Sequence, residues 1–181
     1  MAVGRNAVSL LFTNNHNKYT MKRFPYLLTW FLGLGFLFGM PAFRTTTVAP
    51  SFVSKAWKIQ SIKLDNPVDF NGDGRPDTEL ASFLDACTRD DALIFEANSN
   101  LITDKGTLHC REDEPAKELT GHWIYDLDTH VISVVDLKRI DDTVQWKVLE
   151  STSDTLIIRF DVLPVDGRTA LKATMTLKAA R

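Results

Sequence analysis

The chain has 181 residues, of which 44% are hydrophobic and 10% aromatic, with 21 Lys and Arg against 23 Asp and Glu. This composition excludes a disordered chain, and the ordinary numbers of 9 Gly and 7 Pro exclude a collagen-like one. Residues 1–50 contain five bases and no acid, so residues 51–181 have 16 bases against 23 acids, a net charge of −7. An acidic domain disfavours nucleic acid and anionic membranes as partners, because both bind basic surfaces.

Residues 21–49 have the layout of a secretory signal peptide. A basic start at Met21-Lys22-Arg23 precedes an apolar run over residues 24–40, and small residues follow. The run is shorter than the roughly 20 residues of a membrane span. We expect a signal peptide, with an uncleaved N-terminal anchor as the alternative, after a polar extension over residues 1–20. Residues 50–181 would then form one domain that is secreted, periplasmic or attached to the cell envelope.

Both cysteines, Cys87 and Cys110, lie in the exported part. A pair of cysteines in an oxidising compartment usually forms a disulfide, and this one would contribute about 3 kcal/mol by closing its loop. The alternative is a Cys110 nucleophile activated by His109. Neighbouring residues on a strand point to opposite faces, so we predict the disulfide instead.

From Trp57 onward, apolar and polar residues alternate. The pattern predicts strands over residues 57–62, 92–97, 101–110, 121–127, 131–140, 144–150, 155–162 and 169–179. Turn-forming residues separate them at 98–100, 128–130, 141–142, 151–154 and 166–167. A short helix is expected over residues 77–85. Sequential hairpins favour an all-β, eight-stranded up-and-down antiparallel barrel with one short helix after the first strand, and a sandwich is the alternative.

The segment from Asp69 to Asp77 has the start of an EF-hand-type calcium loop. Oxygen-bearing side chains stand at its first, third, fifth and ninth positions and Gly74 at the sixth. The predicted ligands are Asp69, Asn71, Asp73, the carbonyl of Arg75, and Asp77, in a stabilising role. Position twelve is Leu80 instead of Glu, and the alternative is an acidic turn held by its own side-chain hydrogen bonds.

Catalytic motifs are missing from the sequence, so we predict a protein that is not an enzyme. The histidines, His16, His109, His122 and His130, form no zinc motif, and no GxSxG, P-loop or dinucleotide-binding turn occurs. Acidic clusters stand at Asp90-Asp91, at residues 112–114 and at Asp141-Asp142. They have the positions of solvated turns. A hydrolase that uses one of these pairs as acid and base is a third alternative for the function.

Several aromatic residues fall on inward faces of the predicted strands. They are Trp57, Phe95, Trp123, Tyr125, Trp146 and Phe160. They either form a simple core or line a ligand cavity, because an eight-stranded barrel is just wide enough to be filled by side chains or to hold one small ligand. The predicted ligand wall is Trp123, Tyr125, Trp146 and Phe160. Ala97, Ser133 and Ala173 are small inward residues that would leave room.

Together these features resemble the bacterial lipocalin-like domain proteins. The resemblance rests on Trp57, the acidic loop, Cys87-Thr88-Arg89-Asp90-Asp91, Phe95, Cys110 and Gly121-His122-Trp123. It covers roughly residues 57–179 and implies an exported, calycin-type barrel with a small apolar ligand. We therefore expect a monomeric lipocalin-like protein that binds a small hydrophobic molecule in its interior. The rival is a structural or interaction module of the cell envelope with a filled barrel, stabilised by calcium.

Overall fold

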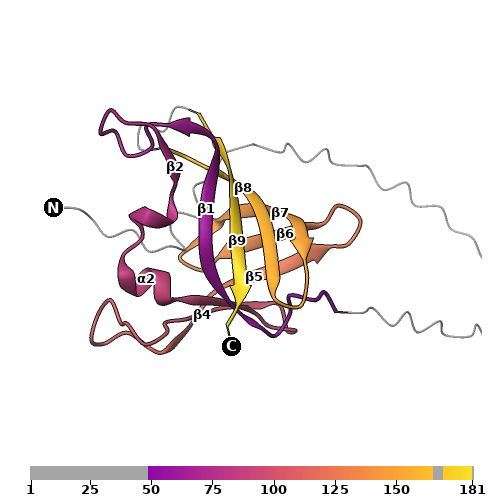
Figure 1. The fold of residues 1–181 in the computed structure, drawn as a ribbon. Coiled ribbons are helices and arrows are strands. Elements are labelled where there is room, and N and C mark those ends of the chain that lie inside the picture. The colour runs from indigo at the N-terminus through magenta and orange to yellow at the C-terminus, as the bar shows by residue number, and fades with distance from the viewer. Residues whose placement is uncertain (1–48, 165–168, 181) are drawn as a thin grey trace, which may run out of the picture. The chain divides into compact units, whose positions relative to one another are not determined.

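The computed structural model describes residues 49–164 and 169–180. Its strands are β1 (Ala56–Val68), β2 (Asp77–Glu79), β3 (Ala92–Phe95), β4 (Asn100–Asp104), β5 (Lys117–Asp126), β6 (Val131–Asp136), β7 (Arg139–Ser151), β8 (Thr155–Val162) and β9 (Leu171–Ala179). Between β2 and β3 lie the 3₁₀ turn η1 (Ala81–Phe83) and the helix α2 (Ala86–Asp90) (Figure 1). The predicted extension over residues 1–20 and nearly all of the predicted signal peptide lie outside the described residues.

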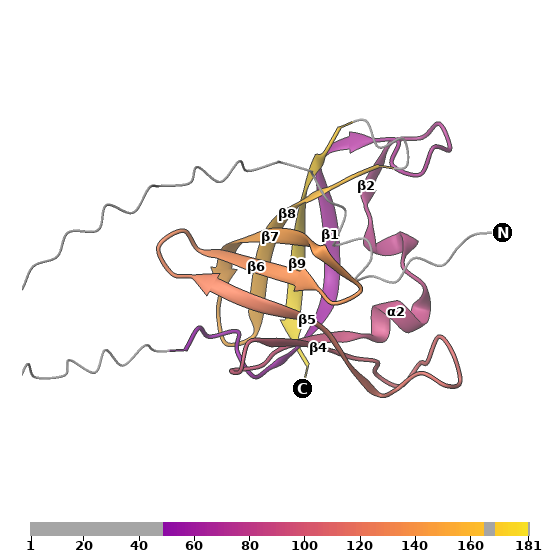
Figure 2. The same cartoon turned by 180° about the vertical axis from the view of Figure 1, so that it is seen from behind.

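The strands close into a ring. From β3 to β9 each strand pairs antiparallel with the next, and β1 pairs with both β3 and β9 (Figures 1 and 2). β1 and β3 to β9 are therefore a closed barrel of eight strands, and β2 is added beside the second half of β1. The predicted all-β, up-and-down antiparallel barrel is confirmed.

The barrel has two distinct ends, because alternate loops of an up-and-down barrel lie at opposite ends. The β3–β4, β5–β6 and β7–β8 turns share one end with the segment that precedes β1, and we call it the plugged end. The β4–β5 loop and the β6–β7 turn lie at the other end, with the segment over residues 69–91. We call this the disulfide end.

Two-residue alternation on each strand explains the register. On β9, Ala173, Met175 and Leu177 are fully buried, while Lys172 and Lys178, which flank them, are exposed. Each fully buried large apolar side chain contributes about 1.5–3 kcal/mol relative to an exposed one. A one-residue slip would turn the whole apolar set outward, so burial selects this register.

A short helix follows the first strand, as predicted, but it does not span residues 77–85. Residues 77–79 instead form β2, which pairs with β1, η1 spans Ala81–Phe83, and the chain reaches α2 only at Ala86. The Glu79 carboxylate accepts hydrogen bonds from the backbone N–H groups of Ile62 (2.7 Å) and Ala81 (3.0 Å). The N–H of Leu80 donates to the Ile62 carbonyl at 2.7 Å, and Leu80 itself is buried. Attachment to β1 therefore overrides the weak helical spacing of a short segment.

Two other local predictions also need correction. The turn expected at Asp141–Asp142 lies instead at Leu137–Lys138, where Asp136 pairs with Arg139 in a tight hairpin and the ladder shifts register just beyond it. The strand expected over residues 101–110 ends at Asp104. The residues that follow belong to the β4–β5 loop, in which Cys110 forms the disulfide. The hairpin signal at residues 166–167 lies outside the described residues.

Gly121 marks a close approach of two strands. A Cβ at this position would lie 2.6 Å from the carbonyl oxygen of Val135, far inside normal contact. The ladder between β4 and β5 shifts register next to it, at Leu101 and Ile102. Glycine at a strand bulge commonly permits this kind of backbone contact.

Phe52 fills the plugged end. It is 1% exposed, and its ring packs edge to face against Phe95 at 5.2 Å, Trp123 at 5.6 Å and Tyr125 at 5.3 Å between centroids. The indole N–H of Trp57 donates to the Phe52 carbonyl at 2.8 Å and fixes the segment that carries the ring. Edge-to-face pairs contribute about 0.5–1.5 kcal/mol beyond area burial. The segment before β1 is therefore part of the core.

The disulfide between Cys87 and Cys110 is confirmed. It joins α2 to the β4–β5 loop, with the two Cα atoms 5.4 Å apart. Neither half-cystine lies on a strand. A covalent link between them restricts the unfolded chain and holds the disulfide end together.

Phe52→Ala should destabilise the protein by about 3–5 kcal/mol, because it leaves a cavity among the aromatic rings of the plugged end. Urea unfolding followed by tryptophan fluorescence measures this loss. Phe83→Ala is the matched control: Phe83 is 40% exposed, and the expected loss is below about 1 kcal/mol. Equal losses in the two variants would contradict the role given to Phe52.

Candidate functional site

The four predicted wall residues divide into two groups. Trp123 and Tyr125 on β5 and Trp146 on β7 belong to the aromatic cluster of the plugged end, where Trp146 lies 6.2 Å from Phe95. The indole N–H of Trp123 donates to the carbonyls of the β3–β4 turn. These three side chains therefore pack against the protein's own residues.

Tyr125 connects this cluster to the surface. Its hydroxyl lies 2.9 Å from Nδ1 of His130 in the β5–β6 turn. Burial, with a smaller effect of the Asp126 charge, raises the pKa of the Tyr125 phenol. The phenol therefore stays neutral at physiological pH. Its uncharged ring and hydroxyl lie at the outer edge of the plugged end.

Phe160 occupies a different part of the interior. It lies on β8 opposite Ala173 of β9, which in turn pairs with Leu64 of β1. All three are buried, and Ala173 is the smallest buried residue of the three strands that meet here. The other two small residues predicted to leave room do not face inward: Ala97 is exposed in the β3–β4 turn, and Ser133 lies on the outward row of β6 between Ile124 and Gln145.

One polar contact lies among the buried residues of β4 and β5. The hydroxyls of Thr103 and Thr120 are 3.1 Å apart, and that of Thr120 also donates to the Leu101 carbonyl at 3.2 Å. Both threonines are at most 5% exposed. These two hydrogen bonds satisfy both hydroxyls within the protein.

The acidic loop is held by its own side chains. The Asp69 carboxylate accepts hydrogen bonds from the backbone N–H groups of Gly72 (2.7 Å), Asp73 (3.0 Å) and Gly74 (2.8 Å). Asn71 accepts from the N–H of Asp73 at 2.8 Å. The turns need glycine, since Gly72 and Gly74 have φ values of 82° and 83°.

These contacts bear on the predicted calcium ligands. Asp73 accepts from the N–H of Arg75 (2.9 Å) and Asp77 from the N–H of Phe70 (3.0 Å), so each loop aspartate already serves a backbone amide. Within the part of the chain that the structure describes, no group of three or more His, Cys, Asp or Glu side chains is placed to hold a metal ion. Calcium binding by this loop remains a prediction.

Asp69→Ala should lower the free energy of unfolding by about 1–2 kcal/mol, because three loop amides each lose an acceptor. If the loop is held only by its own hydrogen bonds, the loss should be the same in calcium and in EDTA, measured by thermal unfolding. Asp113→Ala, whose side chain is 88% exposed, is the control and should have no effect. A stabilisation by calcium that disappears in Asp69→Ala would instead support the metal site.

Asp90 is a hub that the sequence did not reveal. Its carboxylate contacts Lys58 of β1 at 2.7 Å and accepts from the N–H and hydroxyl of Thr107 (2.5 and 3.0 Å) and the N–H of Leu108 (3.1 Å). These contacts, with Lys58 first, hold the pKa of Asp90 well below its usual range. Gly106 makes the approach possible, because a Cβ there would lie 2.3 Å from the Asp90 carboxylate.

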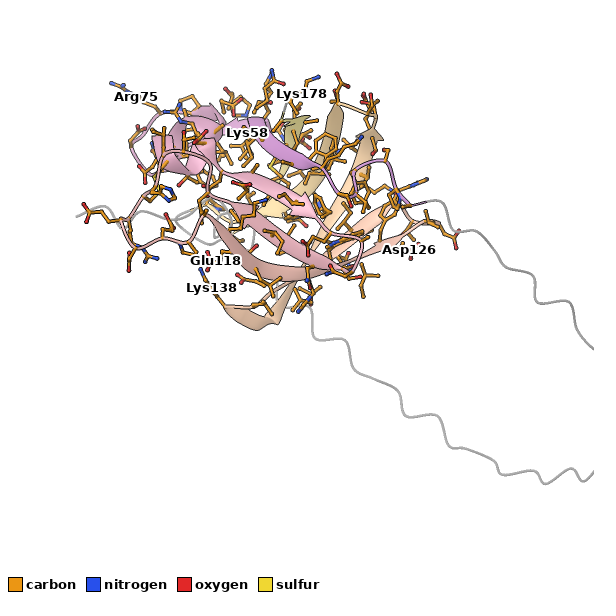
Figure 3. The ribbon with its side chains drawn as sticks, turned by 90° about the horizontal axis from the view of Figure 1, so that it is seen from below. Lys58, Arg75, Glu118, Asp126, Lys138 and Lys178 are labelled. Atoms are coloured by element: carbon orange, nitrogen blue, oxygen red, sulfur yellow. A yellow bond between two sulfur atoms is a disulfide. The ribbon has the colours of Figure 1, made fainter. Side chains whose placement is uncertain are left out.

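Lys105 forms a second, buried centre in the same loop. Its ammonium group lies 3.4 Å from Asp91, 3.4 Å from Glu114 and 3.9 Å from Glu118, and the residue is 5% exposed. Burial raises the pKa of Asp91 against the opposing effect of Lys105. Burial also acts to raise the pKa of Glu114, but Lys105 and a backbone N–H outweigh it, so that pKa is lowered. Glu118 also pairs with Lys138 at 2.9 Å (Figure 3).

These two centres give the acidic residues a structural role. Asp90 and Asp91, treated from the sequence as solvated turn residues, attach the β4–β5 loop to β1 and to the start of β3. The available signal was their position three and four residues after Cys87, the half-cystine that fixes the same loop. The side chains of Asp141 and Asp142 lie outside those that the structure describes.

Acid should destabilise the fold through its hydrogen-bonded carboxylates. The pKa values of Asp90, Glu114, Asp126 and Asp154 are all lowered. The unfolded state therefore binds more protons, and the stability that these groups provide is complete above about pH 5 and is lost as pH falls below the ordinary carboxyl values. Asp91, with its raised pKa, contributes in the opposite direction.

Urea unfolding between pH 7 and pH 2 measures this dependence. In Asp90→Asn the decline should be shallower, and stability at pH 7 should be lower, because the charged acceptor for Lys58 and the loop amides is gone. Asp113→Asn, at an 88% exposed side chain, should follow the unmodified protein at every pH. An unchanged slope in Asp90→Asn would contradict the assignment.

Comparison with known proteins finds no protein-family model and no curated protein that matches the chain. Among the described residues, no helix has the length and apolar character needed to cross a membrane. The closed barrel is compatible with a calycin-type architecture. The arguments about function therefore rest on the barrel's own geometry.

Proposed function

We propose that this chain is an exported lipocalin-like protein that binds a small hydrophobic ligand inside its barrel. One observation carries the proposal: the barrel is closed all round, and its inward positions are apolar on almost every strand. Apolar burial would drive binding at about 25 cal/mol per Å², less the cost of ordering the ligand.

The two ends of the barrel indicate where a ligand would lie. Phe52 and its aromatic neighbours occupy the plugged end, so Trp123, Tyr125 and Trp146 would form the floor of a site. Phe160, beside Ala173, is the predicted wall residue that would line the barrel interior away from the plugged end. Access would be from the disulfide end, past the β4–β5 loop.

Export is part of the same proposal. The disulfide between Cys87 and Cys110 supports an oxidising compartment, because such bonds are rare in reducing cytosol. The basic and apolar segment at residues 21–49 supports a signal peptide that directs the chain there. We place the protein in the periplasm, in the cell envelope or outside the cell.

The second candidate is a non-enzymatic interaction module with a filled barrel. The observation that favours it is the size of the buried side chains: Trp57, Trp146, Phe52 and Phe95 are all at most 1% exposed. If the interior is equally full near Phe160, the protein would act through its outer surface. The state of the interior around Ala173 separates the two functions.

Ala173→Phe distinguishes them. In a ligand-binding barrel the larger side chain should occupy the site, leaving the protein folded and lowering affinity for the neutral apolar dye N-phenyl-1-naphthylamine at least tenfold. In a filled barrel the same change should overpack the core and cost about 1–3 kcal/mol. Dye fluorescence and urea unfolding measure both effects.

Thr176→Phe is the matched control, because Thr176 is on the same strand and faces outward beside Ser61. It should leave dye binding unchanged. An unmodified protein that does not bind the dye, together with an unfolded or destabilised Ala173→Phe, would refute the ligand-binding proposal and support the interaction module.

A further inference from the structure

Positive charge gathers on one outer face of this acidic domain. The outward positions of β1, β8, β9 and residues 143–151 of β7 carry six bases and three acids, although residues 51–181 have a net charge of −7. We call these bases the basic face. They are Lys58, Lys63, Lys147, Arg159, Lys172 and Lys178. Figure 1 shows the four strands side by side.

The register of this face places like charges opposite each other. Lys58 of β1 is the direct cross-strand partner of Lys178 of β9, and the two lie on adjacent strands in Figure 3. Lys147 of β7 is likewise the direct partner of Arg159 of β8. Like charges directly opposite on neighbouring strands are destabilising. The two like-charged pairs on this face therefore do not stabilise the folded domain.

Carboxylates neutralise only part of this charge. Lys58 pairs with Asp90, Arg159 with Asp65, and Lys172 with Asp161. Two of the other three cations have uncharged acceptors: Lys178 donates to the Thr155 hydroxyl at 2.6 Å, and Lys147 donates to the Thr129 carbonyl. Among the described residues, neither of these two lysines forms an ion pair with a carboxylate, although the charge of Lys178 helps to lower the pKa of Asp154.

The cations are spread over the curved outer surface of these four strands, with hydroxyl groups between them. Lys147, Arg159, Thr174 and Lys63 form one row across four strands, which spans about 14 Å at the usual strand spacing. Lys178 is four residues along β9 from Thr174, or about 13 Å. Thr176 and Ser61 are cross-strand partners between them. A single phosphate or carboxylate could not contact this whole area, whereas an extended chain of anionic groups could.

We propose that the basic face binds an anionic polysaccharide. Its negative groups would contact Lys147, Arg159 and Lys178, and its hydroxyls would exchange hydrogen bonds with Thr174, Thr176 and Ser61. An acidic peptide fits less well, because the backbones of β8 and β9 are already paired on both sides and offer no edge to an added strand. The proposal is independent of whether the barrel interior holds a ligand.

Binding of the full chain to heparin and to polygalacturonate, measured by biolayer interferometry at low and high salt, tests the proposal. The double variant Lys147→Gln with Lys178→Gln should lose at least tenfold in affinity for both polymers at low salt. Its melting temperature should stay the same or rise, since each substitution removes one member of an opposed cation pair. Neutral dextran should not bind.

The matched control is Arg111→Gln with Lys117→Gln, which removes the same charge from exposed positions off this face. It should keep its affinity within about twofold. Equal losses in the two double variants would reduce the effect to overall charge and overturn the proposal. Absence of polysaccharide binding, or tighter binding to polyglutamate than to either polymer, would overturn it as well.

Discussion

Pairing of β1 with β9 is the contact on which the rest of the structure depends. It joins the first and last strands from Trp57 and Ala179 to Leu64 and Ala173, and so converts a meander into a ring with no open edge between them. β1 also contacts the segments at both ends of the barrel. The Trp57 indole donates a hydrogen bond to the Phe52 carbonyl, and Lys58 forms an ion pair with Asp90. Without closure, neither the aromatic plug nor the disulfide end would have a fixed partner.

The two ends of the barrel are stabilised by opposite means. At the plugged end, Phe52 completes a cluster of aromatic rings, and hydrophobic burial dominates. At the disulfide end, the covalent bond between Cys87 and Cys110 supports a charged loop in which Asp90 and Lys105 are the centres. An apolar ligand would therefore meet a rigid floor and a polar, disulfide-braced rim.

The interior and the outer surface suggest separate binding properties. The interior is apolar and enclosed, which supports a small hydrophobic ligand. The basic face is polar and lies on the outer surface of the barrel, and its opposed cation pairs are a cost to folding that an anionic polymer would offset. Together the two proposals describe an exported protein that would be held on an acidic matrix while its barrel remains free.

The sequence by itself determined the eight-stranded barrel and the disulfide, because burial forces a two-residue alternation onto the barrel strands and a lone pair of cysteines in the expected oxidising compartment forms a bond. It also identified the residues of the aromatic core, but not which of them would meet Phe52. That contact, the hub at Asp90 and the opposed cations of the basic face depend on the register of strands far apart in the chain. The local sequence pattern does not specify that register, so only the tertiary structure could decide which side chains contact each other.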